Sequence, residues 1–230
     1  MLNSKKIVAL LPMKAKSERV IGKNFKTFNG KPLFKWILDT LLKIEIIDLI
    51  VINTDAKDIL KENGLINSER IMIRNRKKEL CGDMVSMNLV LADDIENVDA
   101  DLFLMTHTTN PFLSSNTIIE ALNLFEIALT NRTADSLFTV SKTQTRFYRS
   151  DGSAVNHDPE NLVRTQDLEE WFEENSNLYI FTKNSFKSTN ARIGLKPILY
   201  PTNKFESIDI DNQEDWDFAN IAANFLKRDN

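Results

Sequence analysis

Short, continuously apolar runs alternate along the chain with longer stretches of helical periodicity. The runs cover residues 7–11, 49–53, 70–73, 102–105, 179–181 and 198–200. Continuous rather than alternating apolarity is typical of strands in a parallel sheet that helices cover on both faces. These runs therefore predict the strands of one buried sheet.

The stretches between the runs carry apolar residues at helical spacing. They predict a helix over 33–42 that begins after Pro32, a second over 83–95, and a third capped by Ser114 or Ser115. A helix near the C-terminus presents one stripe, made of Phe218, Ile221, Ala222 and Phe225. Alternating strands and helices predict right-handed βαβ units and hence an α/β fold, a three-layer α/β/α sandwich with a Rossmann-like, mostly parallel sheet.

This pattern loosens after about Val140. Residues 143–177 are polar, lack a long amphipathic helix and include Asp151-Gly152, a pair typical of hairpin turns. We expect a β-rich arm over 141–178, inserted into an α/β domain of residues 1–140 and 179–230. An arm of this size cannot hold a core of its own, so we expect it to pack on a second copy of the chain.

Composition narrows the class of protein. The 230 residues carry a net charge of −4 and one cysteine, Cys81. A single cysteine excludes an intramolecular disulfide and suits a reducing compartment. The first apolar run is too short for a signal peptide, and no run approaches the roughly 20 residues that span a bilayer. We expect a cytoplasmic protein without membrane contact, and no motif indicates a nucleic-acid partner.

Residues 14–31, the basic loop, follow directly after the first predicted strand. They contain one acid, Glu18, and six cations: Lys14, Lys16, Arg19, Lys23, Lys26 and Lys31. Ligands of α/β proteins bind at the C-terminal ends of strands, so this charge indicates a bound polyanion such as a nucleoside triphosphate. A solvated charged loop is the alternative. The spacings of a P-loop and of a dinucleotide fingerprint are absent.

The basic loop resembles the N-terminal signature of the nucleotide-sugar pyrophosphorylases and, within them, of the acylneuraminate cytidylyltransferases. The matching positions are Pro12, Ser17, Arg19, Gly22, Lys23, Asn24 and residues 30–33, Gly-Lys-Pro-Leu. The resemblance implies that the triphosphate of CTP is bound by Lys14, Ser17, Arg19, Lys23 and Asn24, with Lys23 also catalytic. The chain departs from the signature at Lys14, Lys16 and Glu18, where the family has an arginine, a glycine and a lysine.

Two further motifs imply contacts to the nucleotide. Residues 76–80 resemble the family's R-P-x-x-L, and Gly82-Asp83 with Ser86 resembles the S-D-x-x-S that follows it. The resemblance implies that Arg76 and Ser86 bind the nucleotide. For Arg76 the alternative is a solvated edge, because residues 70–78 hold five basic side chains.

Three motifs imply contacts to a sugar. Residues 106–111 resemble L-Q-P-T-S-P, so His107 stands where the family has a substrate-binding glutamine; a structural histidine is the alternative. Residues 164–167 resemble R-x-Q-D, and residues 174–179 resemble E-N-x-x-x-Y. The implied sugar-binding residues are His107, Arg164, Gln166, Asn175 and Tyr179, with Arg164 as the partner of a carboxylate.

Asp209 and Asp211 belong to a segment that resembles the family's S-x-D-I-D-T-P-E-D motif. In a strand both side chains would point to one face, because the side-chain period is 2. Adjacent carboxylates repel unless a cation or a proton lies between them, and Mg²⁺ that accompanies a triphosphate would serve. Helix capping by Asp211 together with Glu214 is the alternative.

The resemblance as a whole implies an Mg²⁺-dependent cytidylyltransferase that acts as a homodimer. It would join CTP and a nonulosonic acid of sialic type to give a CMP-sugar and pyrophosphate. Asp209 and Asp211 would hold the metal and take part in catalysis. Two alternatives stay open: another sugar nucleotidyltransferase of the same fold, of the CMP-Kdo or NDP-sugar type, or a non-catalytic nucleotide-binding relative.

Overall fold

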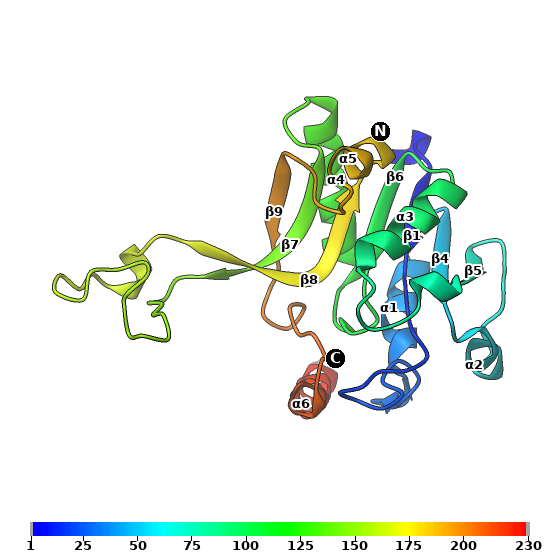
Figure 1. The fold of residues 1–230 in the computed structure, drawn as a ribbon, viewed down its shortest axis with the longest axis horizontal. Helices are drawn as coiled ribbons and strands as arrows, with labels where there is room; N and C mark the ends of the chain where they lie inside the picture. Colours follow the sequence, from blue (N-terminus) through cyan, green and yellow to red (C-terminus); the bar gives the residue numbers. More distant parts are fainter. Residues whose placement is uncertain (1, 229–230) are drawn as a thin grey trace.

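Among residues 2–228, which the computed structural model describes, seven strands form one sheet in the order β5-β4-β1-β6-β8-β7-β9 (Figure 1). The strands are β1 Ile7–Leu10, β4 Leu49–Thr54, β5 Ile71–Asn75, β6 Leu102–Thr106, β7 Ser136–Thr143, β8 Trp171–Phe181 and β9 Pro197–Pro201. Only β8 runs against its neighbours: it pairs antiparallel with β6 and β7, while the other pairings are parallel. The mostly parallel sheet is confirmed.

Helices cover both faces of this sheet because alternate residues of each central strand point to opposite sides. Ile7 and Ala9 pack in one core with α1 (Leu33–Leu42) and α4 (Ser115–Thr130). Val8 and Leu10 pack in another with α3 (Met87–Asn97) and α5 (Lys183–Thr189). The three-layer sandwich is thus confirmed, and none of the described helices is both long and apolar enough to cross a membrane.

All six apolar runs lie in or overlap strands, and the helix over 33–42 is present as predicted. Ser114 caps α4 by accepting a hydrogen bond from the Thr117 amide. The second helix begins later than predicted, at Met87 rather than 83, because Ser86 caps it. The short elements were not expected: η1 Leu2–Ser4, β2 Thr27–Phe28, β3 Lys31–Pro32, α2 Lys57–Glu62, η2 Lys78–Leu80, α5 and η3 Thr165–Asp167.

The C-terminal helix α6 (Gln213–Arg228) buries a different face from the predicted one. Phe218, Ile221 and Phe225 are each more than half exposed, so that stripe was wrong except for Ala222. The buried face consists of Trp216, Ala219, Ala222 and Ala223. It packs on Val20 and Phe28, so α6 lies against the basic loop rather than on the sheet (Figure 1).

Strands β7 and β8 extend beyond the sheet as a two-stranded ribbon that carries a projecting tip (Figure 1). Within residues 144–170 the regular structure is the bridge between Tyr148 and Ala154 and the short helix η3. Asp151-Gly152 does form the turn of that bridge, with Gly152 at φ 84°. The arm is therefore β-structured at its base and irregular at its tip.

Glu206 fixes the segment that leads from β9 to α6. Its carboxylate is buried and accepts hydrogen bonds from the Ser114 amide at 3.1 Å and the Thr117 hydroxyl at 2.8 Å, at the N-terminus of α4. Its backbone carbonyl accepts from the Asn177 side chain at 2.7 Å. A carboxylate at a helix N-terminus is favourable because it meets unpaired amides and the positive end of the helix dipole.

We expect Glu206→Ala to lower the free energy of unfolding by about 2 kcal/mol, since it leaves buried donors unpaired. For a domain of this length that corresponds to a melting temperature about 4–8 °C lower, measurable by thermal denaturation followed by circular dichroism. Glu206→Gln keeps a hydrogen-bond acceptor and is expected to lower the free energy of unfolding by less than Glu206→Ala does. Equal melting temperatures for the wild type and Glu206→Ala would contradict this role.

Candidate active site

A cavity of about 510 Å³ opens where the basic loop, the segments that follow β5 and β6, the start of α3 and the segment before α6 meet. It collects nine of the residues that the sequence singled out: Lys14, Ser17, Arg19, Lys23, Asn24, Arg76, His107, Asp209 and Asp211. The C-terminal ends of parallel strands are the usual ligand site of such sheets. Residues up to 197 positions apart in the chain are thus gathered at one place.

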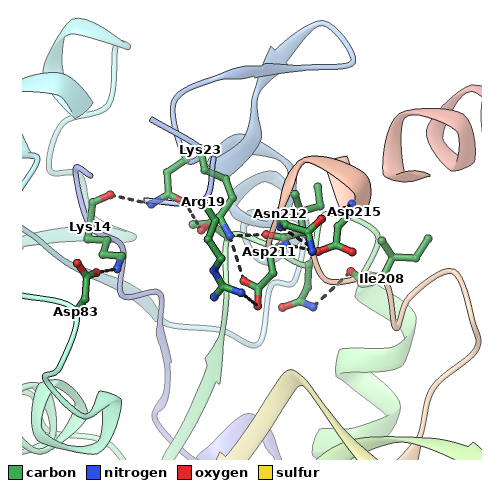
Figure 2. A network of polar contacts seen from close by, with 12 residues as sticks. Lys14, Arg19, Lys23, Asp83, Ile208, Asp211, Asn212 and Asp215 are labelled. Atoms are coloured by element: carbon green, nitrogen blue, oxygen red, sulfur yellow. Dashed lines mark hydrogen bonds and ion pairs between the residues drawn. The ribbon is translucent and has the colours of Figure 1, made fainter. Parts of the chain in front are cut away.

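Lys23 and Arg19 converge on Asp211 (Figure 2). The ammonium group of Lys23 donates to the Ile210 carbonyl and lies 3.3 Å from Oδ1 of Asp211. Nη1 of Arg19 lies 3.2 Å from Oδ2 of the same carboxylate. Lys23 is only 8% exposed, whereas the Arg19 side chain is 67% exposed. Lys23 is therefore a fixed cation of the cavity, whereas the exposed Arg19 has room to turn from Asp211 toward a ligand.

The basic loop is shaped by local hydrogen bonds. Gly22 adopts φ 62°, a conformation that glycine takes without strain, and its carbonyl accepts from the Phe25 and Lys26 amides. Asn24 is buried: its amide donates to the Lys14 carbonyl at 2.8 Å, and its carbonyl accepts from the Thr108 hydroxyl at 2.6 Å. Asn24 thus joins both ends of the loop to the end of β6.

Asp209 and Asp211 do share one side, although the structure assigns no strand to residues 208–211. Ile208 and Ile210 are buried under α6, while the two aspartates line the cavity. The Ile210 amide donates to the Thr109 carbonyl at 3.0 Å, which holds this segment against the end of β6. The predicted side-chain alternation is present, and the predicted strand is not.

Asp211 does not cap α6, contrary to the alternative based on capping. Asn212 caps it instead, by accepting from the Asp215 amide at 3.0 Å. The Asp215 carboxylate reaches back to the Asn212 and Asp211 amides at 3.0 and 2.9 Å (Figure 2). This reciprocal pair is a capping box one residue later than expected. The Asp211 side chain is therefore left to the cavity.

Asp209 provides a test of whether a metal ion suits this site. Its Oδ1 is buried and, within the described part of the chain, has no hydrogen-bond partner. Burial raises the pKa of Asp209 above its usual range, and the Asp211 charge adds to the effect. An unpaired buried carboxylate oxygen beside a second carboxylate fits a hard divalent cation. The described residues contain no group of three or more potential ligands, so water and phosphate oxygens would complete the coordination.

Arg76 is held by a chain of buried polar groups. Its guanidinium donates to Oδ1 of Asn53 at 3.0 Å, and to the Asn53 and Met13 carbonyls at 2.7 and 3.2 Å. The Asn53 amide in turn donates to Asp94 at 2.8 Å. Burial lowers the pKa of Arg76 and raises the pKa of Asp94 to about 6. Arg76 is thus a half-buried side chain of the cavity wall, rather than part of a solvated edge.

Lys14 and Asp83 form an ion pair across the cavity mouth (Figure 2). The hydrogen bond from Lys14 and its positive charge hold the pKa of Asp83 below its usual range. A phosphate that reaches Lys14 must displace the Asp83 carboxylate.

His107 follows β6 and lines the same cavity. Burial lowers its pKa to about 3, and the charge of Arg192 acts in the same direction. The imidazole is therefore neutral at physiological pH, with one nitrogen as donor and the other as acceptor. A neutral imidazole can hydrogen-bond a sugar hydroxyl, as the glutamine it replaces in the motif would.

Five predicted residues are not among those that line this cavity. Ser86 caps α3 and lines a neighbouring hollow. Asn175 donates to Thr202 at 2.7 Å, and the Tyr179 hydroxyl donates to Glu174. Arg164 pairs with Asp167 at 2.7 Å on the exposed arm, which also carries Gln166.

The cavity also contains residues to which the sequence assigned no role, among them Thr108 and Arg192. Thr108 holds Asn24, and Arg192 enters the cavity from the loop after α5. No motif marks Arg192, because a single arginine in a loop carries no periodic signal. Thr108 lies inside the 106–111 motif, but its role depends on a contact 84 positions away.

Comparison with known proteins identifies the family of the chain. A family model described as Cytidylyltransferase matches residues 8–221. CMP-N,N'-diacetyllegionaminic acid synthase of Legionella pneumophila is 27% identical over 222 residues, 92% of this chain and 93% of that protein. 3-Deoxy-manno-octulosonate cytidylyltransferase of Christiangramia forsetii is 29% identical over 121 residues, 53% of this chain. The match spans 46% of the Christiangramia protein, and one to an N-acylneuraminate cytidylyltransferase of Escherichia coli spans 51% of that protein.

Solved structures share the fold. A 4-diphosphocytidyl-2C-methyl-D-erythritol synthase from Anaerococcus prevotii superposes with a TM-score of 0.68 at 16% identity, over 97% of this chain and 98% of that one. A CMP:2-keto-3-deoxy-manno-octonic acid synthetase complexed with CTP superposes with a TM-score of 0.64 at 12% identity, over 97% of this chain and 99% of that one. The family model covers nearly the whole chain. The chain therefore belongs to the cytidylyltransferase family.

Proposed function

We propose that this protein transfers the cytidylyl group of CTP to a sugar acid of nonulosonic, sialic type. The observation that carries the proposal is the meeting of Lys23 with Asp209 and Asp211 in one cavity. In the reaction a sugar hydroxyl would attack the α-phosphorus, the bond to the β-phosphate oxygen would break, and pyrophosphate would leave. Catalysis of such transfers depends mainly on positioning and on charge neutralisation.

The residues divide between the two substrates. Lys14, Ser17, Arg19, Lys23 and Asn24 would bind the triphosphate, and Arg76 the base or ribose. His107 would receive the sugar. Arg164, Gln166, Asn175 and Tyr179 lie outside the cavity of a single chain. We propose that the arm carries Arg164 and Gln166 to a partner's site in a homodimer, while cytoplasmic location stays a prediction.

Asp209 and Asp211 would hold Mg²⁺. Bound there, the ion would offset the charge that develops on the phosphates. Two observations support a metal site here. Oδ1 of Asp209 has no hydrogen-bond partner within the described structure, and two cations pair with Asp211. Arg19 would then turn from Asp211 toward the phosphates, and Lys23 would meet them from its fixed position.

A second candidate acceptor is 3-deoxy-manno-octulosonate. It is favoured by the local identity of 29% to the Christiangramia cytidylyltransferase. It would react in the same cavity, because it too presents a carboxylate beside its anomeric hydroxyl. The two candidates differ in the rest of the sugar.

Pyrophosphate release by the purified chain tests these proposals. The assay combines CTP and Mg²⁺ with N-acetylneuraminate, legionaminate, pseudaminate or 3-deoxy-manno-octulosonate, and omits each component in turn. We expect release only when CTP, Mg²⁺ and a nonulosonic acid are all present. Release with the octulosonate alone would support the second candidate. CTP binding without release in any mixture would point to a non-catalytic relative.

A further inference from the structure

Arg192 is the one cavity-lining cation among residues 2–228 that lies outside the basic loop and the 76–80 motif. It follows α5 in the chain. It lines both the main cavity and a second hollow of about 360 Å³, to which Ser86 and Glu174 also contribute. A charged side chain that separates two hollows is placed to meet a ligand rather than bulk solvent.

The guanidinium is held in place from one side. It stacks on the Tyr179 ring at 3.9 Å, and its Nη2 donates to the Tyr179 hydroxyl at 3.0 Å and to Glu174 at 3.4 Å. Burial raises the pKa of Tyr179 to about 12, so its hydroxyl keeps its proton and donates to Glu174. Within the described residues, Nε and Nη1 of Arg192 make no hydrogen bond, although arginine has five N–H donors.

The loop that carries Arg192 is fixed before any ligand binds. The Thr189 hydroxyl lies within hydrogen-bond distance of the Ala191 and Ile193 carbonyls, at 3.2 and 3.0 Å, and shares its one proton between them. The Gly194 amide donates to the Ser136 hydroxyl at 2.8 Å, and a Cβ at Gly194 would come within 2.4 Å of Asp135. Such a loop adds little ordering cost to binding.

The surrounding charges favour an anion at this place. The Arg192 side chain is 19% exposed, and its one acidic partner among the described residues, Glu174, is 3.4 Å away. His107 lines the same cavity as Arg192, Asp211 and Lys23, and the charges of all three act on its pKa. Lys23, in the basic loop, suits the phosphates. Arg192, on a separate loop, offers a partly desolvated guanidinium, which suits a carboxylate.

We infer that Arg192 binds the carboxylate of the sugar acid. The inference rests on the proposed function and deepens it. In these sugar acids the carboxylate and the attacking hydroxyl are attached to the same anomeric carbon. Anchoring the carboxylate therefore also sets the position of the nucleophile, while CTP is bound elsewhere. Tyr179 acts through Arg192 as a positioning residue.

The test compares Arg192→Gln and Arg192→Lys with wild type in the pyrophosphate assay. We expect Arg192→Gln to raise the KM for the sugar acid about 50-fold or more and to lower kcat, because a charge-assisted bond of about 2.3 kcal/mol or more is lost. The KM for CTP should change less than about twofold. Arg192→Lys should retain part of the affinity. Lys187→Gln, which removes an exposed cation of α5, is the matched control and should behave as wild type.

A carboxamide analogue of the sugar acid sharpens the test. Wild type should prefer the acid strongly over the amide, and Arg192→Gln should discriminate little between them, because each change removes the same interaction. Unchanged KM for the acid in Arg192→Gln, with a raised KM in Arg164→Gln, would place the carboxylate on the arm and overturn the inference. Equal rises in the KM for the sugar acid and the KM for CTP in Arg192→Gln would indicate a structural role for Arg192. That result would also overturn the inference.

Failure of the proposed function would be recognised separately. If wild type releases no pyrophosphate with any acid, the function fails, and titration calorimetry with the same acids then decides the inference. Binding to wild type that weakens in Arg192→Gln would support Arg192 as a carboxylate site. No binding to wild type, or equal binding to both, would overturn it.

Discussion

Replacing Lys23 with Met is expected to lower kcat/KM for CTP by about 10³-fold, the largest effect of any single change in the basic loop. Lys23 is 8% exposed, and its ammonium group is shared between the Ile210 carbonyl and Asp211. It is thus the buried charge that joins the basic loop to the segment of the two aspartates. The substitution removes a preorganised cation and leaves Asp211 with fewer partners, which also disturbs the position of that segment.

Lys16→Met is the matched control, because Lys16 belongs to the same loop but is exposed and is not among the cavity-lining residues. The two variants change the net charge equally. We expect Lys16→Met to stay within about twofold of wild type. Lys23→Arg restores the charge with a different shape and is expected to recover only part of the activity. Equal losses in Lys23→Met and Lys16→Met would mean that overall charge, and not the buried position, matters.

The central sheet could be predicted from the sequence because its strands are buried on both faces. Ile7, Val8, Ala9 and Leu10 are all fully buried, so the run had no polar positions to obscure it. The elements that were missed are short or polar. The hairpin of β2 and β3 turns at Asn29-Gly30, with φ values of 47° and 100°, and this dipeptide is typical of hairpin turns even between strands of two residues.

The face of α6 could not be predicted from periodicity. Phe218, Ile221 and Phe225 repeat at helical spacing, and so do Trp216, Ala219 and Ala223. The larger side chains favoured the first stripe, but the structure buries the second. Small alanines let α6 approach the basic loop closely, where Trp216 packs on Phe28 at 5.4 Å between ring centroids. Tertiary packing decided the face.

In the candidate site, too, some residues could be predicted from the sequence and others could not. Motif order placed the basic loop and the two aspartates in one site, and the structure brings Lys23 and Asp211 together across 188 positions. Arg192 could not be found in this way, because its importance comes from the Tyr179 ring below it and from a loop whose preceding helix was itself not predicted. Contacts that exist only in three dimensions leave no local pattern.

Asp209→Asn is expected to lower kcat by about 10²-fold or more, while the melting temperature at neutral pH rises. Burial raises the pKa of Asp209 in the folded protein above its value in the unfolded chain. A carboxyl whose folded pKa is raised costs stability once it is ionised: the cost is absent below the unfolded pKa and grows as pH rises through the folded pKa. The amide cannot ionise, so the variant avoids this cost and loses the charge that the proposed metal ion would need.

Three measurements check the lower kcat and the higher melting temperature that we expect for Asp209→Asn. Steady-state pyrophosphate release gives kcat, thermal denaturation between pH 4 and pH 8 gives stability, and the shift in melting temperature on adding Mg²⁺ with CTP reports the metal without turnover. The stability gain of Asp209→Asn should vanish toward pH 4, and its Mg²⁺-dependent shift should be smaller than that of wild type. Asp217→Asn, an exposed change on α6, is the control. A variant with full activity, or one that is less stable than wild type at pH 8, would show that Asp209 is a structural carboxylate and that its unpaired Oδ1 is not kept for a metal.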